Sequence, residues 1–146
     1  MYEVAAQESR DLFGAFLSGS ELPLVCVASG APLEGTARTA LENSARQLGY
    51  GDACTFVVLE CPEGSLDAPA LFTLIEGLDP LCLIAADADA ARLLSEAYRC
   101  PVPQGGATRL FGRPTVAFRS FPAMLRSPDD KQRAWALLKK LPRRDG

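Results

Sequence analysis

The sequence predicts an α/β domain, a three-layer α/β/α sandwich in which helices cover both faces of a central, mainly parallel sheet of four strands. Three short segments are continuously apolar: LPLVCVAS (residues 22–29), ACTFVVLE (53–60) and PLCLIAA (80–86). Continuous rather than alternating apolarity is typical of strands that are buried on both faces, as in a parallel sheet. Segments with helical spacing separate these strands, and right-handed crossovers place such helices on both faces of the sheet.

The first part of the chain, residues 1–20, is predicted to form an N-terminal helix. Its apolar residues include Leu12, Phe13 and Phe16 at near-helical spacing, and Gly19 is a suitable stop. After the first strand, residues 36–48 are predicted as the next helix.

The rest of the chain continues the alternation of strands and helices. Further helices are predicted over 71–77, 87–98 and 129–141. Asp87 is the expected N-cap of the second of these helices, because its short carboxylate can accept from free backbone N–H groups. Residues 108–120 fit either a hairpin around Gly112 and Arg113 or a bent fourth strand. Residues 142–146 are expected to form a basic tail.

Length and composition favour one globular domain that spans residues 1–146. The chain is 48% hydrophobic and 23% charged, which is ordinary for a globular protein. No apolar run approaches the roughly 20 residues that a membrane helix needs. Charged residues precede the first apolar run, so we expect no secretory signal, no membrane association and a cytoplasmic location.

Histidine is absent, and the five cysteines are dispersed. Without histidine, Ser-His-Asp and Cys-His catalysis and histidine-bound zinc are excluded. The cysteines form no CxxC pair, and most lie within apolar runs, which favours reduced, buried thiols over an iron–sulfur cluster. We therefore expect no metal and no cofactor.

The net charge of −3 is unevenly distributed along the chain. Residues 1–108 carry five arginines against fifteen carboxylates, whereas residues 109–146 carry ten basic residues against three acids. A basic C-terminal quarter is consistent with weak binding of nucleic acid or of a protein partner. It is equally consistent with a solvated surface that neutralises the acidic body.

Ligands of open α/β sheets bind beyond the carboxyl ends of the strands, so three loops are candidates for one crevice. They are Ser29 to Gly35, Cys61 to Ser65 and Ser120 to Arg126. The first loop could hold an anion on its backbone N–H groups, or it could simply be a tight turn. Glu34 could act as a general base or only favour the start of a helix. Asp87 and Asp89 invite a metal site, although capping explains Asp87 without an ion.

Several stretches together resemble the uracil-DNA glycosylase superfamily, over roughly residues 22–141. TVAFRSFPAMLRSPDDKQRAWALLKKL (115–141) is similar to its C-terminal signature, in which a strand leads into a His-Pro-Ser or His-Pro-Ala motif. The positions that match this signature are Pro122, Ala123, Leu125, Arg126, Lys131 and Trp135. LVCVASGAPLEG, TFVVLECPEG and GLDPLCLIAADADAARLL resemble three earlier family segments in the same order.

The departures from this family fall on the residues that carry its chemistry. Phe121 occupies the place of the histidine, Gly30 that of the first-loop acid, and Phe56 that of the asparagine that reads the base. A phenylalanine ring offers no hydrogen-bond donor to a leaving uracil anion. The resemblance thus implies a degenerate member of the superfamily with an intact scaffold and no catalytic residues.

The resulting prediction is a catalytically inactive, glycosylase-like protein that keeps a cleft for a nucleic acid, a small ligand or a protein partner. The predicted cleft residues are Ser29, Gly30, Ala31, Pro32, Phe56, Ser120, Phe121, Pro122 and Arg126. The alternative is an active DNA glycosylase that uses relocated groups such as Glu34 or Ser120. A third hypothesis sets the resemblance aside and leaves an α/β protein of unrelated role, because an α/β fold does not determine a function.

Overall fold

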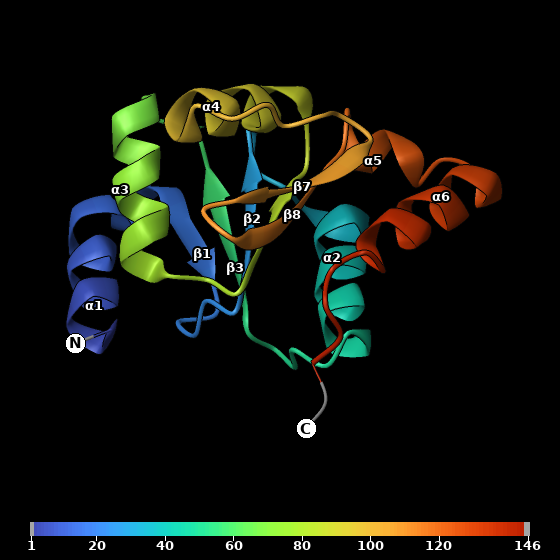
Figure 1. Ribbon diagram of the computed structural model, residues 1–146, viewed down its shortest axis with the longest axis horizontal. Helices are drawn as coiled ribbons and strands as arrows, with labels where there is room; N and C mark the ends of the chain where they lie inside the picture. Colours follow the sequence, from blue (N-terminus) through green and yellow to red (C-terminus); the bar gives the residue numbers. More distant parts are fainter. Residues whose placement is uncertain (1, 145–146) are drawn as a thin grey trace.

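The computed structural model describes residues 2–144 and has an α/β architecture, as the sequence predicted (Figure 1). The helices are α1 (Tyr2–Phe13), α2 (Gly35–Gln47), α3 (Ala68–Leu78), α4 (Ala88–Tyr98), α5 (Phe121–Met124) and α6 (Pro128–Leu138), with a 3-10 turn η1 at Gly14–Phe16. The strands are β1 (Leu17–Gly19), β2 (Val25–Ser29), β3 (Cys54–Val58), β4 (Glu60–Cys61), β5 (Gly64–Ser65), β6 (Cys82–Ala85), β7 (Gly106–Leu110) and β8 (Arg113–Ala117).

The main sheet has six strands in the order β1-β3-β2-β6-β8-β7 and is mixed. The four central strands pair in parallel, in the register Val27 with Phe56, Val27 with Ile84, and Ile84 with Val116. β1 pairs with β3, and β7 pairs with β8, both in antiparallel orientation. The two edge strands of the sheet, β1 and β7, are therefore antiparallel to their neighbours. The sheet is therefore wider than the four strands predicted from the apolar runs.

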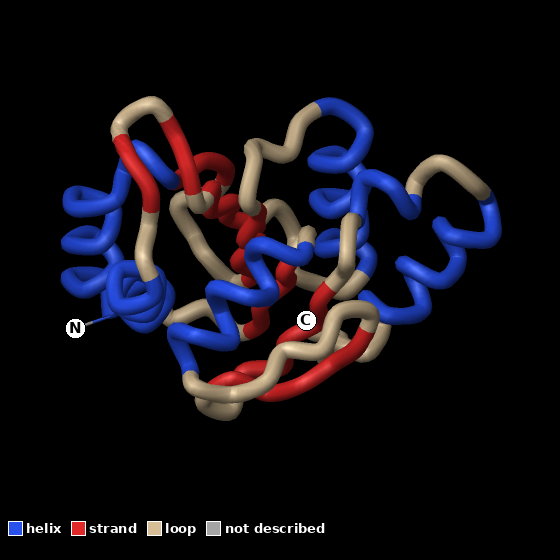
Figure 2. Tube along the Cα trace, turned by 90° about the horizontal axis from the view of Figure 1, so that it is seen from above, coloured by secondary structure: helices blue, strands red, loops and turns tan. Residues whose placement is uncertain are grey.

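Helices pack on both faces of this sheet, because the strand residues alternate between two hydrophobic clusters. Val25 and Val27 belong to the cluster that also contains the apolar residues of α2, α5 and α6. Cys26 and Ala28 belong to the cluster formed with α3 and α4, against which Phe13 and Phe16 also pack. β2 is buried along its whole length, as continuous apolarity requires. Figure 2 shows the helices distributed around the sheet.

The N-terminal region differs from the predicted helix over residues 1–20. α1 ends at Phe13, η1 follows, and residues 17–19 form the edge strand β1. Thr55 anchors this edge, since its hydroxyl donates to the carbonyl of Ser20 at 2.7 Å. A three-residue strand has too little pattern of its own to compete with the helical spacing of Leu12, Phe13 and Phe16. Met1 lies outside the described residues.

The C-terminal half follows the hairpin interpretation of residues 108–120. β7 and β8 are joined by the two-residue turn Phe111-Gly112, and both turn residues have positive φ, 51° and 82°.

Ser127 caps α6, because its hydroxyl accepts from the N–H of Asp130, and this helix therefore starts near the predicted position. It ends at Leu138, three residues earlier than predicted.

The beginning of the predicted basic tail packs against the end of α2. The N–H of Arg144 donates to the carbonyl of Leu48 at 2.7 Å, and the hydroxyl of Tyr50 donates to the carbonyl of Pro142. Gly49 lies beneath this segment with φ +93°, and a Cβ added there would lie 1.8 Å from the Arg144 carbonyl oxygen. Only glycine permits this close approach. Residues 145–146 of the tail lie outside the described residues.

Candidate functional site

The candidate site lies where the carboxyl ends of the central strands meet. Gly30 directly follows the last residue of β2. One residue separates Asp87 from the end of β6, and one residue, Phe118, separates Arg119 from the end of β8. From β2 the chain first moves outward to β3 and later returns to place β6 on the other side of β2. β2 and β6 therefore flank the point where the strand order reverses, which is the usual ligand position in open α/β sheets.

Asp87 uses both of its carboxylate oxygens at this point, one within its own helix and one toward the loop after β2. Oδ1 accepts from the N–H of Ala90 at 2.9 Å and caps α4, as predicted, while Oδ2 accepts from the N–H of Gly30 at 2.8 Å. The N–H of Ala88 donates to the carbonyl of Arg119 at 3.0 Å, and Asp87 forms an isolated bridge with Ser120. The three loops after β2, β6 and β8 are thus held together by direct hydrogen bonds.

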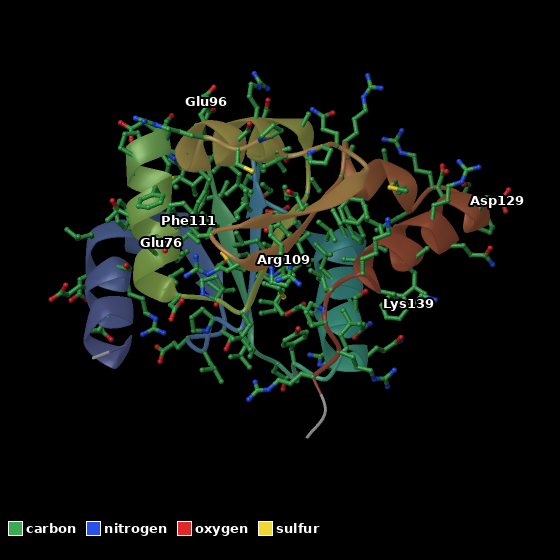
Figure 3. The ribbon with its side chains drawn as sticks, in the orientation of Figure 1. Glu76, Glu96, Arg109, Phe111, Asp129 and Lys139 are labelled. Carbon is green, nitrogen blue, oxygen red and sulfur yellow. The ribbon has the colours of Figure 1, made fainter. Side chains whose placement is uncertain are left out.

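A cleft with a volume of about 630 Å³ opens over these loops. Its apolar lining includes Ala31, Leu59, Leu66 and Leu93. Its charged lining consists of the carboxylates Glu60, Asp87, Asp89 and Glu96 and the guanidinium groups of Arg92 and Arg119. Figure 3 labels Glu96 at the upper side of the molecule, where Figure 1 shows α4.

Two of these carboxylates are engaged within the protein, and two are not. Asp87 accepts two backbone N–H groups, and Asp89 forms an exposed ion pair with Arg92 one helical turn away. Glu60 and Glu96 are exposed and form no ion pair with residues 7–144, the range whose side chains the structure describes, and Arg119 forms none in that range either. The cleft therefore offers two free carboxylates and one free guanidinium above an apolar floor.

The carboxylates of the cleft are spread over its lining rather than gathered at one point. Each oxygen of Asp87 accepts one backbone N–H, which holds this carboxylate between Gly30 and the start of α4. Within the described part of the chain, no group of three or more His, Cys, Asp or Glu side chains is arranged to hold a metal ion.

Of the predicted cleft residues, Gly30 and Ala31 line this cleft. Gly30 is half-buried, and a Cβ added to it would lie 3.0 Å from Cβ of Asp89. That contact is tighter than ordinary van der Waals packing allows. A side chain at this position would therefore push on the start of α4.

Ser29, Pro32 and Phe56 line a separate, smaller cavity of about 110 Å³. Phe56 is only 5% exposed, and the guanidinium of Arg38 lies 4.2 Å above the centre of its ring. The aromatic face that a stacked base would need is thus covered by this cation–π contact.

Phe121, which the sequence resemblance would place at a histidine position, lies in the hydrophobic core. It is 2% exposed, and its ring packs edge-on against Phe118 with 5.1 Å between the ring centres. Its N–H donates to the carbonyl of Ala86 at 2.8 Å. The structure therefore brings Gly30 and Phe121 near the same loops, but the Phe121 side chain points into the core.

Ser120, Pro122 and Arg126 belong to the short helix α5 and its flanks. The hydroxyl of Ser120 accepts from the N–H of Ala123 and caps α5, and Pro122 lies in the first turn of this helix. Arg126 is exposed in the loop before α6. Glu34, the alternative general base, is exposed at the start of α2 and makes no side-chain cap.

The basic C-terminal quarter does not form one uniform set of free cations. Arg113 is nearly buried and pairs with Glu76 and Asp79, while Arg133 pairs with Asp130. Arg109 donates to the carbonyl of Gly112 at 2.9 Å. Arg113 thus pairs with acids of residues 1–108, while the contacts of Arg109 and Arg133 lie within the C-terminal quarter itself.

Sequence reasoning missed the cleft residues of α4 and of β4. Asp89, Arg92, Leu93 and Glu96 follow the spacing i, i+3, i+4, i+7, which places them on one helix face. This spacing was visible in the sequence, but nothing marked that face as lining a cleft. Glu60 was assigned to the end of a strand, and its position in the cleft depends on the small β4–β5 hairpin.

The thiols offer little nucleophilic chemistry in this structure. Cys26, Cys54 and Cys82 are buried, and burial raises the pKa of Cys26 and Cys54 to about 12 and that of Cys82 to about 11. A protonated thiol is a poor nucleophile, so these three side chains act as small apolar core residues.

Comparison with known proteins identifies no family for this chain. No protein-family model matches it, and no curated protein matches its sequence. Among the described residues, no helix combines the length and the apolar character needed to cross a membrane.

Proposed function

We propose that the protein binds a small ligand rich in N–H donors in the cleft, without catalysing a reaction on it. The observation that carries this proposal is that two carboxylates and one guanidinium without ion-pair partners among residues 7–144, those of Glu60, Glu96 and Arg119, line one cleft together with apolar residues. Amino groups and ring N–H groups are the natural partners of carboxylates. A nucleoside with an exocyclic amine, such as cytidine or guanosine, offers such donors on a flat apolar ring.

The charge of the cleft argues against a phosphate-rich ligand there. Four carboxylates and two guanidinium groups line it. At the start of α4, the carboxylate of Asp87 already accepts from the backbone N–H of Ala90. A helix N-terminus that carries its own carboxylate cap has less positive charge to offer an anion. A nucleic-acid backbone would meet like charge at Glu60 and Glu96.

The glycosylase-like scaffold remains part of this proposal. It is supported by four central parallel strands, by helices on both sheet faces and by candidate loops that meet at the carboxyl ends. The absence of catalysis is supported by the lack of histidine and by the burial of Phe121. Asp87, a carboxylate just beyond the end of β6, accepts two backbone N–H groups.

An excision assay tests the inactive character of the scaffold. The purified chain is incubated with single- and double-stranded DNA that contains uracil, and abasic sites are measured. We expect no excision above a blank. Excision that Glu34→Gln or Asp87→Asn abolishes would instead make the protein an active glycosylase.

Calorimetric titration with cytidine, guanosine and uridine tests the ligand class. Cytidine or guanosine should bind, and the double substitution Glu60→Gln with Glu96→Gln should weaken that binding about tenfold, because two charge-assisted hydrogen bonds become neutral ones. The matched control is Glu63→Gln, an exposed carboxylate outside the residues that line the cleft. Binding that is unchanged in the double variant would contradict the proposal.

A further inference from the structure

A second recess lies outside the cleft, beside the β7–β8 hairpin. Its volume is about 480 Å³, and it is bounded by residues of the hairpin and of the segment after α6, including Ala107, Arg109, Pro114, Val116, Lys140 and Leu141. Among the described residues that line it, the charged ones are Arg109 and Lys140, and both are exposed. We call this recess the basic groove.

The groove adjoins an open edge of the main sheet. β7 is the last strand in the sheet order, and among residues 2–144 its one pairing strand is β8. Leu110 and Arg113 flank a two-residue turn and therefore form a hydrogen-bonded pair. In an antiparallel ladder, hydrogen-bonded and non-hydrogen-bonded pairs alternate, so Arg109 with Pro114 and Ala107 with Val116 are non-hydrogen-bonded pairs. The backbone N–H and C=O groups of Ala107 and Arg109 therefore point away from β8. Figure 2 shows the hairpin along one margin of the molecule.

Phe111 stands at the end of this open edge in an unfavourable backbone conformation. Its φ is +51°, a region that bulky residues rarely adopt, and Asn or Gly is the usual choice at this turn position. Its ring contacts Phe72 and Tyr98 at 5.5 and 5.2 Å between centres, yet 67% of the residue is exposed. Figure 3 labels Phe111 and Arg109 at the hairpin. Strained backbone conformations cluster at functional positions such as ligand clamps, and here the strain coincides with a largely exposed aromatic ring.

We propose that an extended acidic peptide segment of a partner protein binds here by adding a strand to β7. The free backbone groups of Ala107 and Arg109 would pair with the peptide backbone. Arg109 and Lys140 attract its carboxylates, and Phe111 supplies an apolar contact beside the turn. A nucleic acid has no N–H and C=O ladder to match the edge of a strand, so the open edge favours a peptide. This site is separate from the cleft and independent of the ligand proposed there.

Selection from a peptide library tests the proposal with the full chain. The library consists of capped heptapeptides with Val, Ile, Thr or Phe at alternate positions and Asp, Glu, Ser, Lys or Arg at the others. We expect enrichment of Asp and Glu, with binding by fluorescence anisotropy that weakens as salt is raised. No enrichment, enrichment of Lys and Arg, or tighter binding of a 12-nucleotide oligothymidine than of any peptide would overturn the proposal.

A matched pair of variants at Ala107 separates strand addition from charge attraction alone. Ala107→Pro removes one outward N–H and leaves every charge in place, whereas Ala107→Val keeps that N–H. We expect the proline variant to weaken the selected peptide about fivefold and the valine variant to leave it unchanged. Equal affinity of the two variants, at matched thermal stability, would contradict strand addition.

Charge reversal supplies a second test that does not alter the strand backbone. Lys140→Glu should weaken the acidic peptide about fivefold at low salt, because attraction becomes repulsion. Lys131→Glu, an exposed lysine on α6 outside the groove lining, is the control and should have little effect. If both variants weaken binding equally, the peptide responds to net charge only and the groove is not its site.

Discussion

The cleft and the basic groove belong to the same sheet, but they are built in opposite ways. The cleft lies beyond the buried parallel strands, where Asp87 caps α4 and joins it to the loop after β2 by accepting from the Gly30 N–H. The groove lies beside an antiparallel edge strand, and no strand of residues 2–144 pairs with the outer edge of β7. Carboxylates dominate the cleft lining, while the charged residues of the groove lining are Arg109 and Lys140. The centre of the sheet thus provides a preformed recess, and its edge provides a surface that a partner can extend.

Alkaline pH should affect the centre of the sheet most. The pKa of Cys26 and Cys54 is about 12 and that of Cys82 about 11 in the folded protein, against an ordinary value of 9.0. Above pH 9 the unfolded chain therefore binds fewer protons than the folded one, so stability is lost as pH rises through this range. We expect the free energy of unfolding to fall by about 4 kcal/mol between pH 7 and 10, measured by urea unfolding with reductant present.

A matched variant distinguishes thiol titration from other alkaline effects. Cys26→Ala should remove about one third of the pH dependence of the free energy of unfolding. This holds however much the substitution itself destabilises the protein at pH 7. Cys61→Ala, at the half-buried cysteine of β4, is the control. A pH dependence that is identical in both variants would show that other groups cause the loss of stability.

Loss of Asp87 should be the most damaging single change in the cleft. Asp87→Ala removes the cap of α4 and the acceptor for the Gly30 N–H, so we expect a loss of about 3 kcal/mol in urea unfolding. Asp87→Asn keeps one acceptor oxygen and should lose about half as much. If the two variants are equally stable, Asp87 does not join the loops as the structure indicates.

Loss of Arg113 tests how the hairpin of the groove is attached. The Arg113 side chain is 12% exposed and binds Glu76, Asp79 and the carbonyl of Pro80. Arg113→Ala leaves partly buried carboxylates unpaired, so we expect a loss of about 2 kcal/mol in the free energy of unfolding. Hydrogen exchange should accelerate in β7 and β8 more than in β2. Uniform acceleration across the sheet would contradict a local attachment.

Phe111→Asn should have the smallest effect on stability. Relief of the left-handed strain is worth about 1–2 kcal/mol, and it offsets the aromatic contacts with Phe72 and Tyr98 that are lost. We expect a net change below about 1 kcal/mol in thermal unfolding. A loss above about 2 kcal/mol would make Phe111 a packing residue, and its exposed ring would then need no partner.

Much of the central sheet could be predicted from the sequence, because its signals are local. The continuous apolar runs predict β2, β3 and β6, and Asp87 predicts the start of α4. β1 was missed because three residues of an edge strand carry almost no pattern. Of the predicted cleft residues, Gly30 and Ala31 line the large cleft, because they directly follow a strand whose carboxyl end forms it.

The sequence by itself determined which segments are buried, where helices begin and that histidine chemistry is excluded, since these depend on residue type and on spacing along the chain. Only the tertiary structure decided where side chains point. Phe121 lies in the core because Phe118 and α6 pack around it, and Glu60 lines the cleft because a small hairpin brings it beside α4. Such placements follow from contacts between segments far apart in the chain, which local spacing does not encode.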